Sequence, residues 1–142
     1  MIIDASVVID AVTDAGPRGL AARRALADHP ALEPLLAPGH LAVEVLSGLV
    51  AAAHRPTHPL QPGQIDQALL DAAALEITIE GTPWDDVRRA WALAQTSLRY
   101  PDAVYIASAE RHGMALLTSD ARIQRSGARI RCAIVTIQPE DV

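Results

Sequence analysis

The chain has 142 residues, of which half are hydrophobic, and its formal net charge is −5 at pH 7. This length favours a single domain over residues 1–142, and it allows a hydrophobic core to form without disulfide bonds. The hydrophobic content argues against intrinsic disorder, and the negative charge argues against a passive nucleic-acid binder, which usually carries a basic surface.

Features that the sequence lacks indicate its compartment. The N-terminus has no basic stretch of the kind found in signal peptides, and Asp4 and Asp10 interrupt its hydrophobic run. No uninterrupted hydrophobic run approaches membrane-spanning length, and the one cysteine, Cys132, cannot form an intrachain disulfide. We therefore expect a cytoplasmic protein with no membrane segment.

Short hydrophobic runs alternate along the chain with segments of helical pattern. The first run ends on Asp4, and a helix is predicted to begin at Ser6. A later helix should begin at Thr82, a capping hydroxyl followed by proline, and another should end at Gly113. In chain order, the predicted helices cover 6–12, 18–27, 39–53, 62–74, 82–98, 101–113 and 119–126, and the predicted strands cover 1–4, 34–37, 75–79, 115–118 and 133–137. The segment 75–79 also fits the end of the helix before it.

The helix predicted over 39–53 carries a wide hydrophobic stripe on one face. The stripe consists of Leu41, Val45, Leu46, Leu49 and Val50. Glu44 lies opposite the centre of this stripe, so the pattern alone predicts a solvated glutamate. Its helical neighbours are small, which would let another element or a substrate approach closely; they are Ser47, Gly48 and Ala51.

Strands that alternate with helices indicate an α/β fold in which a parallel sheet is covered on both faces. In such sheets, ligands bind beyond the carboxyl ends of the strands. Asp4 and Asp120 each follow a predicted strand, so both should project from the same edge. Asp102 lies in the first turn of a helix, just after Pro101, and that turn can face the same edge.

These aspartates predict a site for a divalent cation. Carboxylates packed together repel one another, which raises their pKa values and costs stability unless a cation neutralises them. Mg²⁺ and Mn²⁺ prefer oxygen ligands and fit such a cluster better than Zn²⁺ does. A bound divalent ion activates water and offsets charge on a phosphate, so phosphodiester hydrolysis is a natural use of the site. Taken singly, each aspartate also fits an ordinary helix cap.

Four short stretches together carry a family resemblance. They are residues 1–6 (MIIDAS), 43–45 (VEV), 100–107 (YPDAVYIA) and 117–120 (LTSD). In this order they resemble the PIN-domain nucleases and, within them, the VapC-type toxins. The resemblance implies a three-layer α/β/α sandwich around a central parallel sheet, a Mg²⁺ or Mn²⁺ site and endonucleolytic cleavage of RNA. It also implies a homodimer and a small inhibitory antitoxin of the VapB type.

The same resemblance assigns catalytic and metal-binding roles to four acidic residues. Asp4 matches the acidic ligand after the first strand, and Glu44 matches the helical acidic residue. Asp102 matches the aspartate that opens the Asp-Ala-x-Tyr helix, and Asp120 matches the aspartate of the Thr-x-Asp turn. Ser6 matches a nearby hydroxyl, which can hold water or backbone in the site or simply cap the helix. All four acidic positions are intact, which implies an active enzyme.

Two arginines lie beside these aspartates in the sequence. Arg99 comes just before Asp102, and Arg122 comes just after Asp120. Either guanidinium can clamp a substrate phosphate, because arginine binds phosphate through paired hydrogen bonds. An ordinary solvated arginine also fits both positions.

Other candidate groups favour ordinary structural roles. Trp84 and Trp91 lie two turns apart on one helical face, which is typical of a core or dimer contact rather than a base-stacking platform. The five histidines show no paired metal spacing, so we expect surface or loop positions. We interpret Cys132 as a small buried residue rather than a nucleophile.

Other phosphate-handling folds fit poorly. A receiver domain needs a basic residue, normally lysine, near its last strand, and this chain has no lysine. A phosphatase with an Asp-x-Asp pair needs a carboxylate where Ser6 stands, and the Gly-Lys motif of a P-loop is missing. A PIN-fold module that binds a protein partner, with negligible catalytic activity, stays open as the alternative. The identity of the RNA, and whether DNA is also cleaved, stays open too, because no residue can be assigned to a 2′-hydroxyl.

Overall fold

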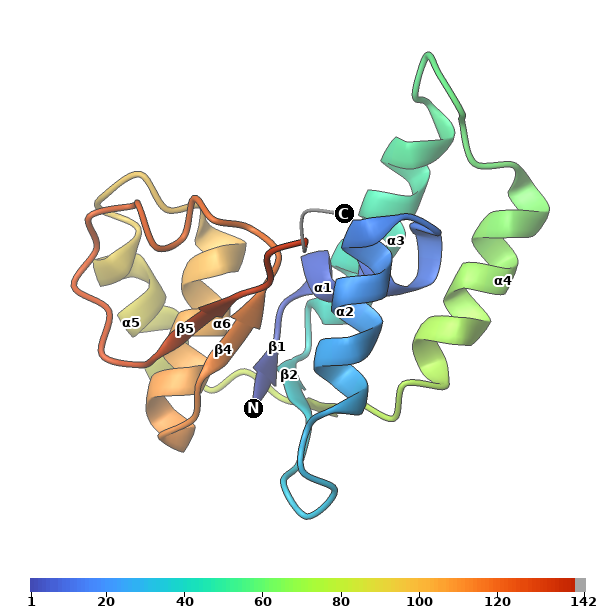
Figure 1. Cartoon of the computed structure of the whole chain (residues 1–142). Coiled ribbons are helices and arrows are strands. Elements are labelled where there is room, and N and C mark those ends of the chain that lie inside the picture. The colour runs from blue at the N-terminus through green and yellow to red at the C-terminus, as the bar shows by residue number, and fades with distance from the viewer. Residues whose placement is uncertain (140–142) are drawn as a thin grey trace.

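A five-stranded parallel sheet organises residues 1–139, the part of the chain that the computed structural model describes (Figure 1). The strands are β1 (Ile2–Ile3), β2 (Leu36–Pro38), β3 (Thr78–Glu80), β4 (Leu116–Thr118) and β5 (Ile134–Thr136). Their order in the sheet is β3-β2-β1-β4-β5. Ile2 of β1 pairs with Leu36 on one side and with Leu116 on the other, so β1 is the central strand. The five predicted strands are confirmed, each shorter than its hydrophobic run, and the segment 75–79 contributes to β3.

Helices cover both faces of this sheet. They are α1 (Ala5–Thr13), α2 (Pro17–Ala27), α3 (Leu41–Ala53), α4 (Pro62–Ala73), α5 (Trp84–Leu93) and α6 (Tyr100–His112). Figure 1 places α5 and α6 on one side of the sheet and α1 to α4 on the other. The predicted α/β/α sandwich is therefore confirmed. None of these helices in residues 1–139 is long and apolar enough to cross a membrane.

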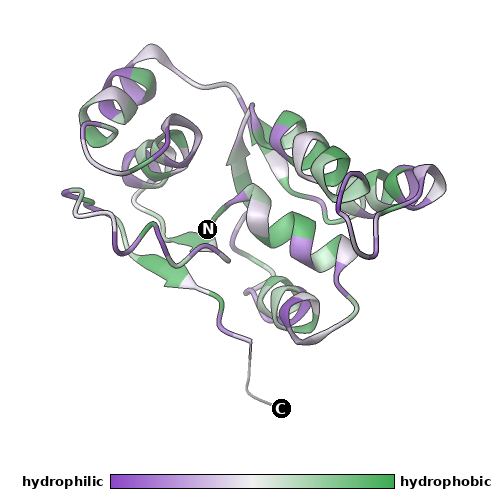
Figure 2. Cartoon of the chain, turned by 90° about the horizontal axis from the view of Figure 1, so that it is seen from above, coloured by the Kyte–Doolittle hydropathy of each residue, from purple (hydrophilic) through white to green (hydrophobic). Residues whose placement is uncertain are grey.

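The core lies where α1 and α6 meet the central strands. Ile2 and Ile3 of β1 are fully buried, as are Tyr105 and Ile106 of α6. The strands are coloured largely as hydrophobic residues in the view from above (Figure 2). Burial of this aliphatic surface is the main favourable contribution to folding. In α3, the stripe residues Leu41, Val45 and Leu49 join the core, whereas Leu46 and Val50 are exposed, so the stripe is narrower than predicted.

The first helix begins one residue earlier than predicted, because Asp4 is its cap. The Asp4 carboxylate accepts a hydrogen bond from the backbone N–H of Ser6, which satisfies one free donor of the first turn. Ser6 therefore lies inside α1 and does not cap it. The residue that ends β1 also begins α1, so the carboxylate is fixed by both elements.

Two other helix predictions were wrong, one in its bounds and one in the presence of the helix. The helix predicted over 82–98 is α5, which begins after Pro83 without a cap from Thr82 and ends at Leu93. It ends there because the Thr96 hydroxyl donates to the Leu93 carbonyl and the chain turns to bury Leu98. The segment 119–126 forms successive turns with hydrogen bonds between residues three apart, and no helix. The positive φ of Gly113, by contrast, ends α6 as predicted.

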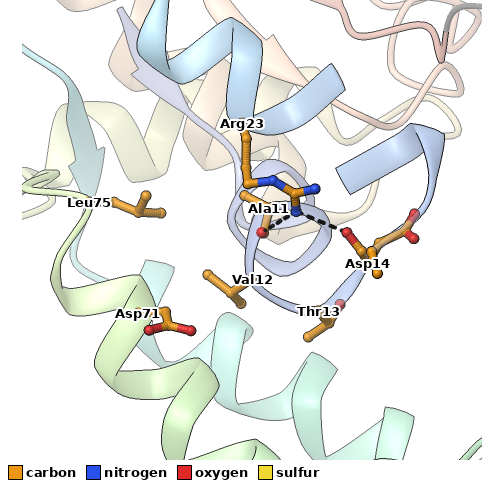
Figure 3. A pocket seen from close by; sticks show the side chains of 8 residues that line it. Ala11, Val12, Thr13, Asp14, Arg23, Asp71 and Leu75 are labelled. Atoms are coloured by element: carbon orange, nitrogen blue, oxygen red, sulfur yellow. Dashed lines mark hydrogen bonds between the residues drawn. The ribbon is translucent and has the colours of Figure 1, made fainter. Parts of the chain in front are cut away.

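At the opposite end of α1 from Asp4, a hollow separates α1 from α2 and α4 (Figure 3). Arg23 of α2 reaches over it and donates hydrogen bonds of 2.9 Å to the carbonyl oxygens of Ala11 and Asp14. A guanidinium at the C-terminus of a helix satisfies free carbonyl groups and complements the helix dipole. Arg23 therefore ties α2 to the end of α1.

Gly19 allows α2 to pack against the end of α1, and its replacement tests this packing. A Cβ at Gly19 would overlap the backbone carbonyl of Asp14, whereas a Cβ at Gly63 of α4 would meet nothing. We expect Gly19→Ala to lower the free energy of unfolding by about 2 kcal/mol or more, because backbone must move. Gly63→Ala, the matched control, should raise it by about 0.5–1 kcal/mol. Urea denaturation measures both, and equal effects would contradict the packing described.

Candidate active site

The four acidic residues predicted from the sequence lie around one cleft at the carboxyl edge of the sheet. The cleft has a volume of about 400 Å³, and Asp4, Glu44 and Asp120 line it. Asp102 is buried beside them, and its charge acts on both Asp4 and Glu44. The four residues come from the end of β1, from α3, from α6 and from the turn after β4. The fold therefore brings together side chains that are more than a hundred residues apart in the sequence.

Asp4 is the most enclosed carboxylate at the cleft, with 4% of its surface exposed. Its Oδ2 accepts hydrogen bonds from the hydroxyls of Ser6, at 2.8 Å, and Thr118, at 2.6 Å. Burial raises the pKa of Asp4, and the nearby Asp102 charge raises it further, although these hydroxyls favour the ionised form. The fold thus disfavours the charged form of Asp4, and the two hydroxyls offset part of this cost.

A hydroxyl network joins the two strand ends beneath Asp4. The Ser6 Oγ accepts a hydrogen bond of 3.0 Å from the backbone N–H of Ser119. The Thr118 Oγ1 accepts one of 3.0 Å from the backbone N–H of Asp120. Ser6 and Thr118 therefore fix the turn that carries Asp120 as well as the Asp4 carboxylate. Sequence reasoning singled out Ser6 but not Thr118, although the Thr-x-Asp pattern contains it.

Glu44 lines the cleft. Its position on the helix alone had predicted a side chain in open solvent. Partial burial raises the pKa of Glu44, and the Tyr105 hydroxyl and His40 act in the opposite direction. Its Oε2 lies 3.6 Å from His40 Nε2. Gly48, one turn further along α3, lets the Ile9 side chain of α1 approach closely. The small residues of α3 thus admit a neighbouring helix, which closes the cleft beside Glu44.

Arginines hold the other two carboxylates. Arg99 donates to both carboxylate oxygens of Asp102, at 3.1 and 3.2 Å. Arg122 donates through Nε and Nη2 to Asp120, with a shortest distance of 2.7 Å. The Arg122 guanidinium lowers the pKa of Asp120. Both arginines therefore lie at the mouth of the cleft, where their guanidinium groups border the predicted site.

The carboxylates at the cleft are the ligand type that a hard divalent cation prefers, but their side chains do not converge on one point. In residues 1–139, no three acidic, histidine or cysteine side chains converge closely enough to hold a metal ion. Two of the four carboxylates are paired with arginines instead. The donor set is nonetheless made of carboxylate oxygens, which Mg²⁺ and Mn²⁺ prefer. Burial, and to a smaller extent the neighbouring carboxylate charges, raise the pKa values of Asp4 and Glu44, and a cation among them would favour their charged forms.

Three side chains outside this set are partly buried. His40 lies in the turn before α3, where its ring packs on Tyr105 and its Nε2 lies 3.1 Å from the Pro101 carbonyl oxygen. His112 is also partly buried, and its Nε2 lies 2.7 Å from Glu80. Burial raises the pKa of the Cys132 thiol to about 11, which suits an unreactive residue. No pattern in the sequence singled out His40, because its partners lie in a distant helix.

Known proteins share both the sequence pattern and this fold. The model of the PIN domain family matches residues 1–128. Ribonuclease VapC3 of Mycobacterium tuberculosis is 32% identical over 126 residues, which are 89% of this chain and 86% of that protein. The crystal structure of VapC20 of the same organism, described as a sarcin-ricin loop cleaving toxin, superposes with a TM-score of 0.66 at 18% identity and covers 89% of this chain and 95% of its own. A toxin-antitoxin complex from Klebsiella pneumoniae matches with a TM-score of 0.67 at 22% identity, over 99% and 98% of the two chains.

The burial of Asp4 predicts how stability changes with pH in the absence of metal. Because the folded chain holds the Asp4 proton to higher pH than the unfolded chain does, stability should fall as pH rises from about 4 through the raised pKa. We expect Asp4→Asn to remove part of this decline. The melting temperature of the variant, minus that of the wild type, should therefore increase as pH rises. Asp66→Asn, an exposed carboxylate of α4, is the control. Thermal melts in EDTA measure the effect, and parallel curves for all three proteins would contradict it.

Proposed function

Because the chain belongs to the PIN-domain family, and within it to the VapC ribonucleases, we propose that its acidic cleft hydrolyses RNA phosphodiester bonds with the help of Mg²⁺ or Mn²⁺. One observation carries this proposal. Four carboxylates from four separate elements meet at one cleft, and burial raises the pKa of two of them. A cluster of this kind is costly unless it serves a cation, and perturbed carboxylates concentrate at functional sites.

Asp4, Glu44, Asp102 and Asp120 are the residues that would hold the cation. When bound, a divalent ion lowers the pKa of water and offsets negative charge on a phosphate. Ser6 and Thr118 keep Asp4 ionised and oriented through their hydroxyl hydrogen bonds. No side chain need act as a nucleophile, and Cys132 remains protonated away from the cleft.

Arg99 and Arg122 would bind the substrate phosphate. Both are side chains at the cleft mouth with most of their surface exposed, and both are paired with proposed ligands. If Asp102 and Asp120 served as metal ligands, Arg99 and Arg122 would be free of them and available for paired hydrogen bonds to phosphate. Their charges would also offset the negative field of the cleft, which otherwise repels RNA.

The proposed biological role is that of the toxin in a toxin-antitoxin pair. The solved complex from Klebsiella pneumoniae supports this, because its toxin and antitoxin were captured together and this chain matches it over nearly its whole length. We propose an antitoxin of the VapB type as the partner, which would inhibit the enzyme by covering the acidic cleft. The activity would belong in the cytoplasm, where a lone thiol such as Cys132 persists.

A second copy of the chain is the other proposed partner. The chain has two tryptophans, two tyrosines and no phenylalanine. Three of these four are exposed on α5 and the start of α6: Trp84 by 82%, Trp91 by 60% and Tyr100 by 58%. The rings of Trp91 and Tyr100 stack at 6.3 Å. A core role for the tryptophans is thus wrong, and we propose that this aromatic face, completed by Val87, is the homodimer contact, because aromatic residues are enriched in interfaces.

The catalytic proposal is tested with a mixed structured RNA in Mg²⁺, Mn²⁺ or EDTA. We expect discrete products that require metal, and a loss of about 100-fold or more in Asp4→Asn and Asp102→Asn, since several kcal/mol of metal-assisted stabilisation would be lost. Asp66→Asn on the exposed face of α4 should cleave like the wild type. Cleavage that survives in the two site variants would indicate a contaminant. No cleavage by any of the proteins, once they have been freed of bound antitoxin, would favour a protein-binding module.

The dimer proposal is tested by mass in solution. We expect the wild type to behave as twice the chain mass of 15.1 kDa in light scattering after gel filtration. Trp91→Glu should dissociate it, because burying a charge without a partner is costly. Leu32→Glu, at a fully exposed position outside the aromatic face, should leave the mass unchanged. A wild-type monomer, or a Trp91→Glu dimer, would rule out this face.

A further inference from the structure

The hydroxyl of Tyr105 is a buried polar group beside the acidic cluster, and within residues 1–139 it makes no contact with full hydrogen-bond geometry. Tyr105 is completely buried, so water does not reach it from the surface. A buried donor left unsatisfied costs about 1–3 kcal/mol, and native proteins contain few of them. A group of this kind beside a proposed active site therefore needs a physical explanation.

The position of Tyr105 points its hydroxyl at the acidic cluster. Tyr105 follows Asp102 by three residues in α6, so the two side chains share one face of the helix. Glu44 and Asp4 are the carboxylates whose charges act on the Tyr105 hydroxyl. The hydroxyl thus lies close enough to interact with the Glu44 carboxylate and the Ala5 backbone, but neither contact has the distance and angle of a full hydrogen bond.

The Tyr105 ring is held in place from two directions. On one side it packs against the His40 ring, with the centroids 4.4 Å apart. His40 itself bridges α3 and α6 through the Pro101 carbonyl oxygen and the Glu44 carboxylate. On the other side the tyrosine is enclosed by the core that α6 forms with the central strands. The ring is thus rigid, and Glu44, which is only partly buried, is the partner free to adjust.

We propose that Tyr105 is a positioning residue for Glu44, whose carboxylate accepts the hydrogen bond of the Tyr105 hydroxyl when the site holds its divalent ion. This inference rests on the proposed function of the cleft. A carboxylate that serves a metal is commonly oriented by a second hydrogen bond, and loss of that bond costs about 10–100-fold in metal affinity or activity.

Tyr105→Phe tests the proposal, because it removes the hydroxyl and keeps the ring. Ser108→Ala is the matched control: Ser108 lies one turn further along α6, and its hydroxyl is also buried without a partner in the described chain. Three quantities are compared with the wild type. They are the melting temperature in EDTA, the Mg²⁺ dissociation constant from calorimetry, and kcat and KM for RNA cleavage at saturating Mg²⁺.

We expect Tyr105→Phe to melt at or above the wild-type temperature in EDTA, because an unsatisfied polar group is removed. Its Mg²⁺ dissociation constant should rise, or its kcat should fall, by about 10-fold or more with little change in KM for RNA. Ser108→Ala should change neither the Mg²⁺ dissociation constant nor kcat. A stable fold with weakened metal use separates positioning from a purely structural role.

Two results would overturn the inference. The first is a Tyr105→Phe protein with wild-type Mg²⁺ affinity and wild-type kcat. The second is a variant that melts lower in EDTA and loses activity only in proportion to its unfolded fraction. If the wild type binds Mg²⁺ but cleaves no RNA, the proposed nuclease function fails, while the affinities of the two variants still decide the role of Tyr105.

Discussion

The burial of several carboxylates together at one edge of the sheet is the constraint on which the rest of this site depends. The parallel topology brings Asp4 and Asp120 together, and α3 and α6 add Glu44 and Asp102. Each charge is then met by a specific group of the fold: hydroxyls for Asp4, a histidine for Glu44 and an arginine for each of the other two. Without a cation, these contacts are what allows the cluster to exist in a stable protein.

The same constraint explains why the structural and chemical roles of several residues coincide. Asp4 caps α1 and is the most enclosed carboxylate of the cleft. Thr118 completes β4, supports Asp4 and fixes the turn before Asp120. His40 packs on Tyr105 and pairs with Glu44. Site geometry and fold stability are therefore coupled, and the arginines that pair with Asp102 and Asp120 also line the cleft.

Much of the fold, and part of the site, was predictable from sequence because both rest on local rules. Hydrophobic runs that end on aspartates, in a chain that alternates strands with helices, place Asp4 and Asp120 at one edge. Glu44 needed the family resemblance, since its helical position predicts solvent. His40, Thr118 and Tyr105 depend on contacts between distant elements, which periodicity does not encode. The early end of α5 and the exposed tryptophans likewise reflect tertiary contacts and surfaces beyond the reach of local patterns.

The central claim is that these four carboxylates form one divalent-cation site. A crystal soaked in Mn²⁺ and measured for anomalous scattering tests it directly, because the ion reports its own position. The account predicts a peak within bonding distance of carboxylates from at least three of Asp4, Glu44, Asp102 and Asp120, with Arg99 or Arg122 displaced from its acidic partner. A fully soaked crystal with no peak in the cleft, or with the ion bound elsewhere while both arginine pairs stay intact, would contradict it.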